Sequence, residues 1–236
     1  IEYTAPRTGH EYTIMDRNVG ATTSTLGLVT TQGLQYQFGR KDPFTTSLDY
    51  DEEVAVFLRN VRSDSLPHLF SYEEPLTIAQ AIGKPDVFIH RMNLSGGKWC
   101  ETSEMKYLWG NPEGQVEYFP SLTVKTIYDP CPIGYKVPPV DALILKMKSY
   151  SQYEHGGIYY AGEEGDNTKL INMPAVHSAY YAYGTSIAYW TSSDFGKPNS
   201  TFEWGEFGVM HTYYPGSYTL RYNAFARPGS IRCVKE

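Results

Sequence analysis

The part of the chain after Tyr150 consists of short runs in which apolar and polar residues alternate, separated by Gly, Asn and Pro. Alternation with a period of two is typical of strands that bury one face, and the separating residues are those that form turns. No run recurs at the fixed spacing of a solenoid or propeller. The pattern predicts a β-rich part with long surface loops, built from the runs GIYYAG, LINMPA, SAYYAYG, AYWTSS, FEWGEFGVM and YTLRYNAFARPGSIRCV.

Two segments before Tyr150 carry clear helix signals. Residues 51–62 place apolar side chains at positions i, i+3, i+4 and i+7, with acidic residues at the start, where the helix dipole favours them. Residues 76–85 offer Thr77 as an N-cap, an apolar face that includes Ile82, and Gly83 followed by a proline as a stop. We expect a short helix in each segment.

A third helix is predicted over residues 137–149. Two prolines precede Asp141, and Lys146 and Lys148 lie at the far end, where the helix dipole favours positive charge. A turn at residues 129–134 leads into this segment.

Strand and turn signals lie near the N-terminus. Residues 13–23 begin as a strand and run into turn-forming residues, which predicts a strand-to-loop corner. Residues 33–38 alternate apolar side chains with Gln, which predicts a half-buried strand. The turn after it, residues 39–43, offers Arg40 and Asp42 as an ion pair.

Composition limits the classes of partner. With 236 residues, 41% of them hydrophobic, the chain can bury a core. A formal net charge of -6 without a run of Lys or Arg argues against nucleic acid, because binding to phosphate needs clustered cations. No apolar stretch reaches the roughly 20 residues that span a bilayer. Ile1 without a preceding Met indicates a processed or trimmed chain.

Several motifs occur in an order that resembles a known family. They are MDRNVGATT, GLQYQFGRKDPF, LTIAQAIGKPDVFI, LWGN, KTIYDPCPIGYKVP, YWTSS and SIRCVKE. In this order they are similar to the Fibrobacter succinogenes major paralogous domain family, which is abundant in surface lipoproteins and fimbrillin-like proteins of Bacteroidetes. The sequence departs from the family pattern at Ile14, where Trp is usual, and at residues 173–177.

The resemblance implies an α+β fold of the C-type lectin-like type. Short helices would pack on small antiparallel sheets with long surface loops. Residues 13–236 would form a single domain, and residues 1–12 an N-terminal linker or edge segment. The resemblance also implies an exported protein at the cell surface or outer membrane, facing outward.

The resemblance further implies a structural disulfide between Cys131 and Cys233. The alternative is two reduced, buried thiols. A bond would close a loop of about 100 residues, which the chain-entropy model values at about 4 to 5 kcal/mol. Exported proteins favour this oxidation. Cys100 would then be the odd thiol, and we interpret it as a small buried hydrophobic residue rather than a nucleophile.

The YWTSS motif combines a large ring with a cluster of hydroxyls. Trp190 supplies a large area for burial and needs a partner for its indole N–H. Thr191, Ser192 and Ser193 can make hydrogen bonds where a strand leaves the core. We interpret the motif as core framework, with ligand stacking as the alternative.

Catalytic and metal-binding motifs are missing from the sequence. It contains no Gly-x-Ser-x-Gly elbow, no His-Glu-x-x-His and no P-loop, so we interpret the protein as non-enzymatic. The sugar-binding tripeptides of calcium-dependent lectins are absent as well. No cofactor or metal is expected, although calcium stays open. A cluster of oxygen ligands is interpreted as a solvated acidic turn, with calcium as the alternative; it comprises Glu163, Glu164, Asp166 and Asn167.

Aromatic residues with nearby carboxylates form the candidate ligand site. Rings can pack on the C–H faces of sugars while carboxylates accept their hydroxyls. The candidate ligand-binding residues are Tyr181, Glu203, Trp204, Glu206, His211, Tyr213 and Tyr214. Other tyrosines of the same aromatic loop set are Tyr159, Tyr160, Tyr180 and Tyr183, which we expect to lie mostly in the core or at its rim.

Two hypotheses of different classes follow. The first is a cell-surface adhesin-type binding module for a glycan or a surface protein. The second is a structural or assembly subunit of a fimbria or envelope complex, which would contact other fimbrial subunits.

Overall fold

A computed structural model describes the chain in segments, which are residues 1–5, 8–25, 31, 33–43, 69–71, 76–85, 88–90, 99–100, 107–110, 124–143, 146–153, 156–162, 171–174, 189–192, 209–214, 217–221 and 228–236. The predicted helix over residues 51–62, the acidic turn and the run SAYYAYG lie outside these segments. Within them, none of the helices is long and apolar enough to cross a membrane.

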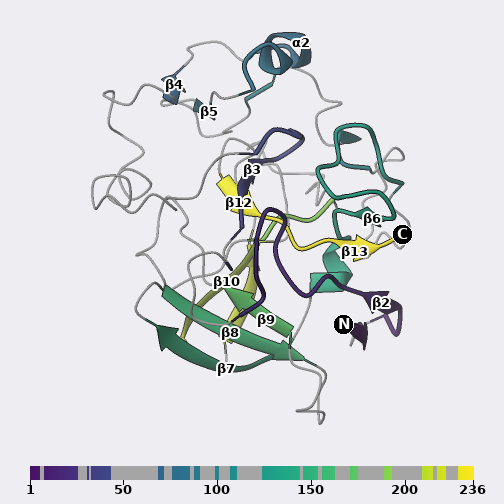
Figure 1. Cartoon of the computed structure of the whole chain (residues 1–236), viewed down its shortest axis with the longest axis vertical. Coiled ribbons are helices and arrows are strands. Elements are labelled where there is room, and N and C mark those ends of the chain that lie inside the picture. Colours follow the sequence, from purple (N-terminus) through teal and green to yellow (C-terminus); the bar gives the residue numbers. More distant parts are fainter. Residues whose placement is uncertain are drawn as a thin grey trace, which may run out of the picture.

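The described segments form small sheets and short helices, and all strand pairs except β4–β5 are antiparallel. Figure 1 shows α2, β4 and β5 at one end of the long axis and β7, β8 and β9 at the other. In chain order the elements are β1 (Glu2–Thr4), β2 (Glu11–Thr13), β3 (Gln35–Gln37), β4 (Leu69–Ser71), α2 (Ile78–Ile82), β5 (Phe88–His90), β6 (Tyr135–Lys136), the 3₁₀ helix η3 (Val140–Leu143), β7 (Lys146–Tyr153), β8 (Gly156–Gly162), β9 (Ile171–Pro174), β10 (Val209–Tyr214), β11 (Ser217–Arg221), β12 (Pro228–Ser230) and β13 (Val234–Lys235).

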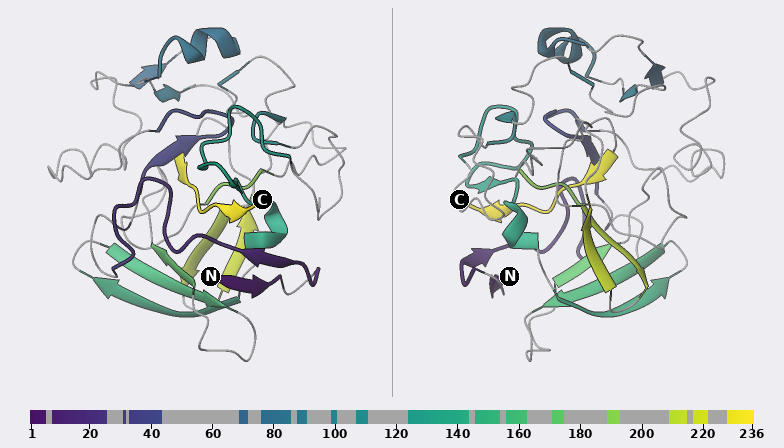
Figure 2. Two further views of the ribbon diagram at one scale, coloured as in Figure 1. Left: turned by 45° about the vertical axis from the view of Figure 1, so that its right-hand side comes forward. Right: turned by 180° about the vertical axis from the view of Figure 1, so that it is seen from behind.

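The two ends of the chain meet in a set of short strands. β1 pairs with β2 in a hairpin, and β13 pairs with β6. Ile14, directly after β2, forms an antiparallel bridge with Val234, and the Met15 N–H donates to the Cys233 oxygen at 2.9 Å. Both chain ends therefore lie on the same side of the molecule (Figure 2).

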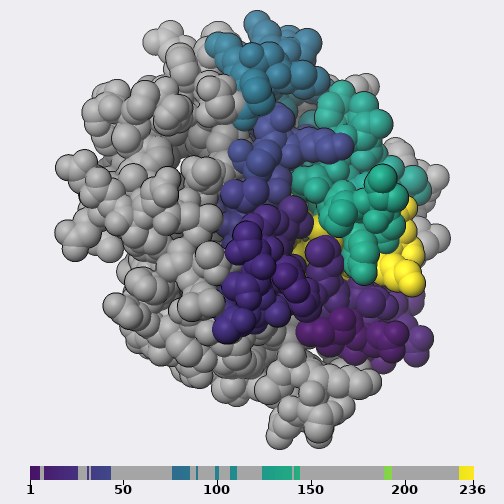
Figure 3. Space-filling view, in the orientation of Figure 1, coloured from purple at the N-terminus to yellow at the C-terminus, as the bar shows by residue number. Residues whose placement is uncertain are grey.

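These regions also share one face of the surface. Figure 3 shows the N-terminal residues, residues 124–143 and the C-terminal strand side by side. The strand-to-loop corner predicted for residues 13–23 is present, because β2 ends at Thr13 and bends and turns follow.

Trp190 lies in the core beside the β3–β12 pair. Its side chain is fully buried, and its indole N–H donates to the Tyr36 oxygen at 2.8 Å. Its backbone N–H donates to the Ser230 oxygen at 2.9 Å. The rings of Phe38 and Trp109 meet it edge-on, with centroids 5.8 and 6.5 Å away. The prediction that YWTSS belongs to the core framework is confirmed for residues 189–192.

The hydroxyl residues after Trp190 are buried where the chain leaves this core. The backbone N–H and the hydroxyl of Ser192 both donate to the Pro138 oxygen, at 2.8 and 3.3 Å. Thr191 is equally buried. Ser193 lies outside the described residues.

β3 was predicted to be half-buried, and this part of the prediction is wrong. Gln35 and Gln37 are as buried as Tyr36 between them. The Gln37 amide donates to the Ile89 oxygen at 2.7 Å and accepts from the Ile89 N–H at 3.1 Å. A Gln side chain can be buried here because its polar atoms pair with backbone from β5.

The turn after β3 contains the predicted ion pair. Arg40 Nη2 lies 3.4 Å from Asp42 Oδ2, and Arg40 is buried. The guanidinium also donates to the Lys84 oxygen at 2.8 Å and to Gln37 Oε1 at 3.1 Å. Arg40 therefore joins the turn to the residues that follow α2.

The helix predicted within residues 76–85 is confirmed. Thr77 is the N-cap, and with Gln80 it forms a capping box. The helix ends at Gly83, as predicted. Ala81 is buried, whereas Ile82 is 56% exposed, so the predicted apolar face is narrower than expected.

The helix predicted over residues 137–149 is wrong beyond its first turn. The 3₁₀ helix η3 ends at Leu143, and Lys146 and Lys148 belong to the strand β7. β7 pairs with β8, and these ladder hydrogen bonds override the helix propensity of the segment, which is only a weak guide to structure. The turn predicted at residues 129–134 is present, with hydrogen-bonded turns at both of its ends.

The predicted β-rich part after Tyr150 is confirmed in the described residues. β7, β8 and β9 form a three-stranded antiparallel sheet, and β10 and β11 form a hairpin. Tyr159 and Tyr160 lie within β8 rather than in a loop. In Figure 2 the β10–β11 hairpin is seen beside this sheet, and β11 contacts β7.

Candidate functional site

The structure places part of the candidate ligand site on one strand. His211, Tyr213 and Tyr214 belong to β10, which pairs with β11. Outside the described residues lie Tyr181, Glu203, Trp204 and Glu206. The described part of the candidate site is therefore an aromatic strand of a hairpin.

The pairing of this hairpin is irregular at its aromatic end. His211 is opposite Thr219 and Tyr214 is opposite Ser217, and the register shifts between these two pairs. A bulge of this kind adds a residue to one strand and increases the local twist. Bulges often re-aim side chains next to binding sites, so the backbone here has a feature that suits a ligand-binding edge.

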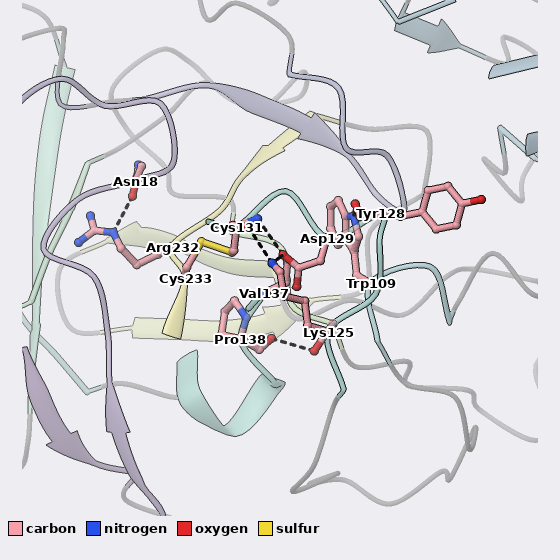
Figure 4. The surroundings of a disulfide bond; sticks show 11 residues. Asn18, Trp109, Lys125, Tyr128, Asp129, Cys131, Val137, Pro138, Arg232 and Cys233 are labelled. Atoms are coloured by element: carbon pink, nitrogen blue, oxygen red, sulfur yellow. Dashed lines mark hydrogen bonds and ion pairs between the residues drawn. A yellow bond between two sulfur atoms is a disulfide. The ribbon is translucent and has the colours of Figure 1, made fainter. Parts of the chain in front are cut away.

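The disulfide expected from the resemblance is present. Cys131 and Cys233 are bonded, their Cα atoms are 5.9 Å apart, and both residues are buried. Their separation of 102 residues encloses every candidate ligand-binding residue. Figure 4 shows the bond between the turn that contains Asp129 on one side and the Asn18–Arg232 pair on the other.

Asp129 organises the turn on the Cys131 side. Its Oδ1 accepts from Lys125 Nζ at 2.8 Å and from the Cys131 N–H at 2.7 Å. Its Oδ2 accepts from the Val137 N–H at 2.8 Å. Burial raises the pKa of Asp129, and the Lys125 amine and the backbone donors offset this only in part. These bonds fix the approach of Cys131 to the last strand.

A polar network lies on the Cys233 side. Arg232 is fully buried, and its Nε donates to Asn18 Oδ1 at 2.7 Å. Asn18 Nδ2 in turn donates to the Tyr189 hydroxyl at 2.9 Å. Burial lowers the pKa of Arg232 and raises that of Tyr189, and their mutual interaction opposes both shifts. The network links the residues after β2 to YWTSS and to the last strand.

A second polar cluster, not predicted from the sequence, surrounds Asp141 on η3. Thr8 Oγ1, His10 Nδ1 and the Tyr12 hydroxyl lie 3.0, 3.1 and 2.8 Å from Asp141 Oδ2. The Tyr3 hydroxyl donates to the Ala142 oxygen next to it. We refer to Thr8, His10, Tyr12 and Asp141 as the Asp141 cluster.

The Asp141 cluster combines a buried carboxylate with a partly exposed imidazole. Asp141 is 1% exposed, whereas the His10 side chain is 46% exposed. The sequence carries only a weak sign of this cluster. Asp141 is a polar residue shortly after two prolines, but its partners lie some 130 residues earlier in the chain. The cluster joins two segments and holds the His10 ring in place.

The described segments contain no group of three or more His, Cys, Asp or Glu residues that could hold a metal ion. Cys100 is buried and takes no part in the disulfide, as the sequence predicted. Its place between core residues suits a small apolar side chain rather than a nucleophile.

Comparisons with known proteins give no match. No family model, curated protein or solved structure matches this chain.

Proposed function

We propose that this chain is an exported, non-enzymatic binding module of the cell surface, with a C-type lectin-like fold. It binds a glycan or a surface protein through the aromatic residues between Tyr181 and Tyr214. The order of the sequence motifs supports the class of protein, and the residue types of the candidate site support the class of ligand.

The Cys131–Cys233 disulfide is the observation that carries this function. A bond of this kind persists in oxidising compartments, which agrees with export. It closes the segment that holds all candidate ligand-binding residues, and its two ends are fixed by the Asp129 turn and the Arg232 network. The disulfide already holds the two ends of this segment together. Long loops can therefore project from a rigid scaffold.

The side chains of the candidate site match what a sugar requires. Tyr and Trp rings offer flat apolar faces, and Glu203 and Glu206 offer acceptors for hydroxyls. Tyr213, Tyr214 and His211 lie on β10, next to the bulge. The substrate class that fits best is a neutral or amino glycan, since the chain is acidic overall.

The experiment is a glycan-array screen of the oxidised domain, run once with calcium and once with a chelator. We expect saturable binding to a related group of glycans, and a loss of about tenfold or more for Trp204→Ala and Tyr213→Ala at an unchanged melting temperature. Ile133→Ala is the matched control, because Ile133 is 98% exposed and lies outside the candidate site.

A lack of binding in both conditions would contradict glycan recognition. If binding survives both aromatic substitutions, the ligand binds elsewhere on the protein. If the chelator abolishes binding, a calcium ion takes part in the site.

The second candidate function is an assembly subunit, and one surface feature favours it. Val124, Ile127 and Ile133 are 64, 78 and 98% exposed, and all three flank the Asp129 turn. A contiguous patch of exposed apolar side chains marks a protein contact, and these three residues lie close together in the sequence. If this function holds, Ile127→Ser with Ile133→Ser will weaken self-association in analytical ultracentrifugation, whereas Trp204→Ala will not.

A further inference from the structure

The N-terminal hairpin, described over residues 1–5 and 8–13, contacts η3 through its side chains and β13 through β2. Its β1 and β2 strands pair with each other, and its turn is closed by bonds between Ala5 and His10 and between Gly9 and Ala5, at 2.7 and 2.9 Å. Tyr3 and Ala5 are buried. The hairpin is thus a small folded unit, and its Thr8, His10 and Tyr12 side chains reach η3.

Three side chains of this hairpin converge on one oxygen atom. Thr8, His10 and Tyr12 all contact Asp141 Oδ2, at 3.0, 3.1 and 2.8 Å. Among the described residues no donor reaches Asp141 Oδ1, although it is buried. All described side-chain bonds to this carboxylate therefore come from the hairpin.

Because all three side chains contact the same oxygen atom, we expect the contacts between the hairpin and Asp141 to form and break together. If the hairpin moves away, Asp141 loses every one of those donors together, and the hydroxyls and imidazole must find water instead. Hydrogen bonds to a charged acceptor are stronger than those between neutral groups. Asp141 alone therefore provides much of the attraction between the hairpin and η3.

The stacked aromatic rings all belong to the hairpin and not to η3. Tyr3 and Tyr12 stack on each other, with centroids 5.9 Å apart, and His10 meets Tyr12 edge-on at 6.4 Å. Burial and the nearby Asp141 raise the pKa of both tyrosines, so both hydroxyls keep their protons as donors. Lys136 on β6 is the further charged group that interacts with Asp141.

The chain just after the hairpin is held differently. Ile14 forms a bridge with Val234, and the Met15 N–H donates to the Cys233 oxygen, beside the disulfide. These backbone bonds do not involve Asp141. Ile14 also exchanges two backbone hydrogen bonds of 2.8 Å with Ile1, so it is the junction between the hairpin, which ends at Thr13, and the disulfide-bonded framework.

We propose that the N-terminal hairpin opens and closes as one unit on the framework, with Asp141 as its anchor and the boundary at Thr13. In the closed form the hairpin covers Asp141 and Ala142. In the open form it exposes them while β3, β12 and the disulfide stay intact. Such local opening belongs to the low-stability end of a fold, where conformational regulation takes place.

Hydrogen exchange of the full oxidised chain tests this device. In Asp141→Asn we expect the amides of Ala5 and Gly9 to exchange about tenfold faster or more, because the charged acceptor is gone. The amides of Met15 and Trp190 should keep their protection. Asp129→Asn is the matched control, because Asp129 is an equally buried carboxylate that bonds to a different turn.

Tyr12→Phe is a milder second variant, which removes one donor and keeps the ring stack. It should accelerate the same hairpin amides by a smaller factor than Asp141→Asn. Unchanged exchange at Ala5 and Gly9 in both variants would overturn the anchor. Equal acceleration of the hairpin and of Trp190 in both variants would overturn independent opening, because the hairpin would then be part of one cooperative unit.

Discussion

Trp190 and Tyr36 are joined across 154 residues of sequence by a buried hydrogen bond of 2.8 Å from the indole N–H to the backbone oxygen. The bond ties YWTSS to β3. It places the largest ring of the motif against Phe38 and Trp109, where β12 also passes.

Replacing this ring tests its part in the core. Trp190→Phe removes the indole N–H, leaves the Tyr36 oxygen without that donor and opens a cavity. We expect a loss of about 2 to 4 kcal/mol in the free energy of unfolding, measured by chemical denaturation. Ile133→Ala, at an exposed position, should change it by less than about 0.5 kcal/mol. Equal stability of the two variants would show that Trp190 lies outside the core.

Gly229 leaves room for the same ring. A Cβ atom at this position would lie 2.6 Å from Trp190 Nε1. We expect Gly229→Ala to cost about 1 to 3 kcal/mol of unfolding free energy through overpacking. Gly83→Ala is the control, because its φ is negative and its nearest atom is 3.5 Å away. Comparable melting temperatures for both variants would contradict the close packing.

The disulfide should contribute much of the stability of the framework. Cys131→Ser with Cys233→Ser opens a loop of 102 residues, and we expect a loss of about 4 to 5 kcal/mol. Cys100→Ala should cost far less, since only a small side chain is removed. Thiol titration of the denatured, unreduced protein should find Cys100 alone. If Cys131 and Cys233 also react there, the bond is absent in solution.

High pH should unfold the protein through its buried tyrosines. Burial raises the pKa of Tyr36 from 10.0 to about 12, and Tyr3 and Tyr189 shift in the same direction. The folded state therefore binds these protons more tightly than the unfolded state. The resulting stability is complete below pH 10 and is lost as the pH rises toward 12, by about 3 kcal/mol for Tyr36.

Tyrosinate absorbance and circular dichroism, recorded together, check this. A late tyrosinate step should coincide with loss of secondary structure, and Tyr36→Phe should move that step to higher pH. If all tyrosines ionise in one early step while the circular dichroism stays unchanged, the phenols are accessible in the folded protein.

Local signals in the sequence were sufficient for some elements. Thr77 and Gly83 bound α2 because capping and stop residues act within one turn of the helix. Trp190 could be assigned to the core because a large ring next to small hydroxyl residues has few other stable places.

Other features depend on residues that are distant in sequence. The segment at Lys146 is a strand because β8 pairs with it. Gln37 is buried because the backbone of Ile89 satisfies its amide. Asp141 gains its donors from residues more than a hundred positions earlier. Periodicity and capping carry no information about such partners.

The candidate ligand site is predicted only in part. His211, Tyr213 and Tyr214 share one strand, whereas the sequence pattern predicts an aromatic loop set for them, between the runs FEWGEFGVM and YTLRYNAFARPGSIRCV. The grouping of these residues with Trp204, Glu203, Glu206 and Tyr181 stays a prediction, because residues brought together by loops carry no periodic signal.

The pairing of Ile14 with Val234 and the bond between Cys131 and Cys233 also determine how the protein responds to mechanical tension. A force applied to both ends would first separate the terminal strands. It would then extend only the residues outside the covalent loop, because the 102-residue segment is bypassed by the sulfur bridge. The part of the chain with the candidate ligand residues would therefore carry no load while the ends are pulled apart.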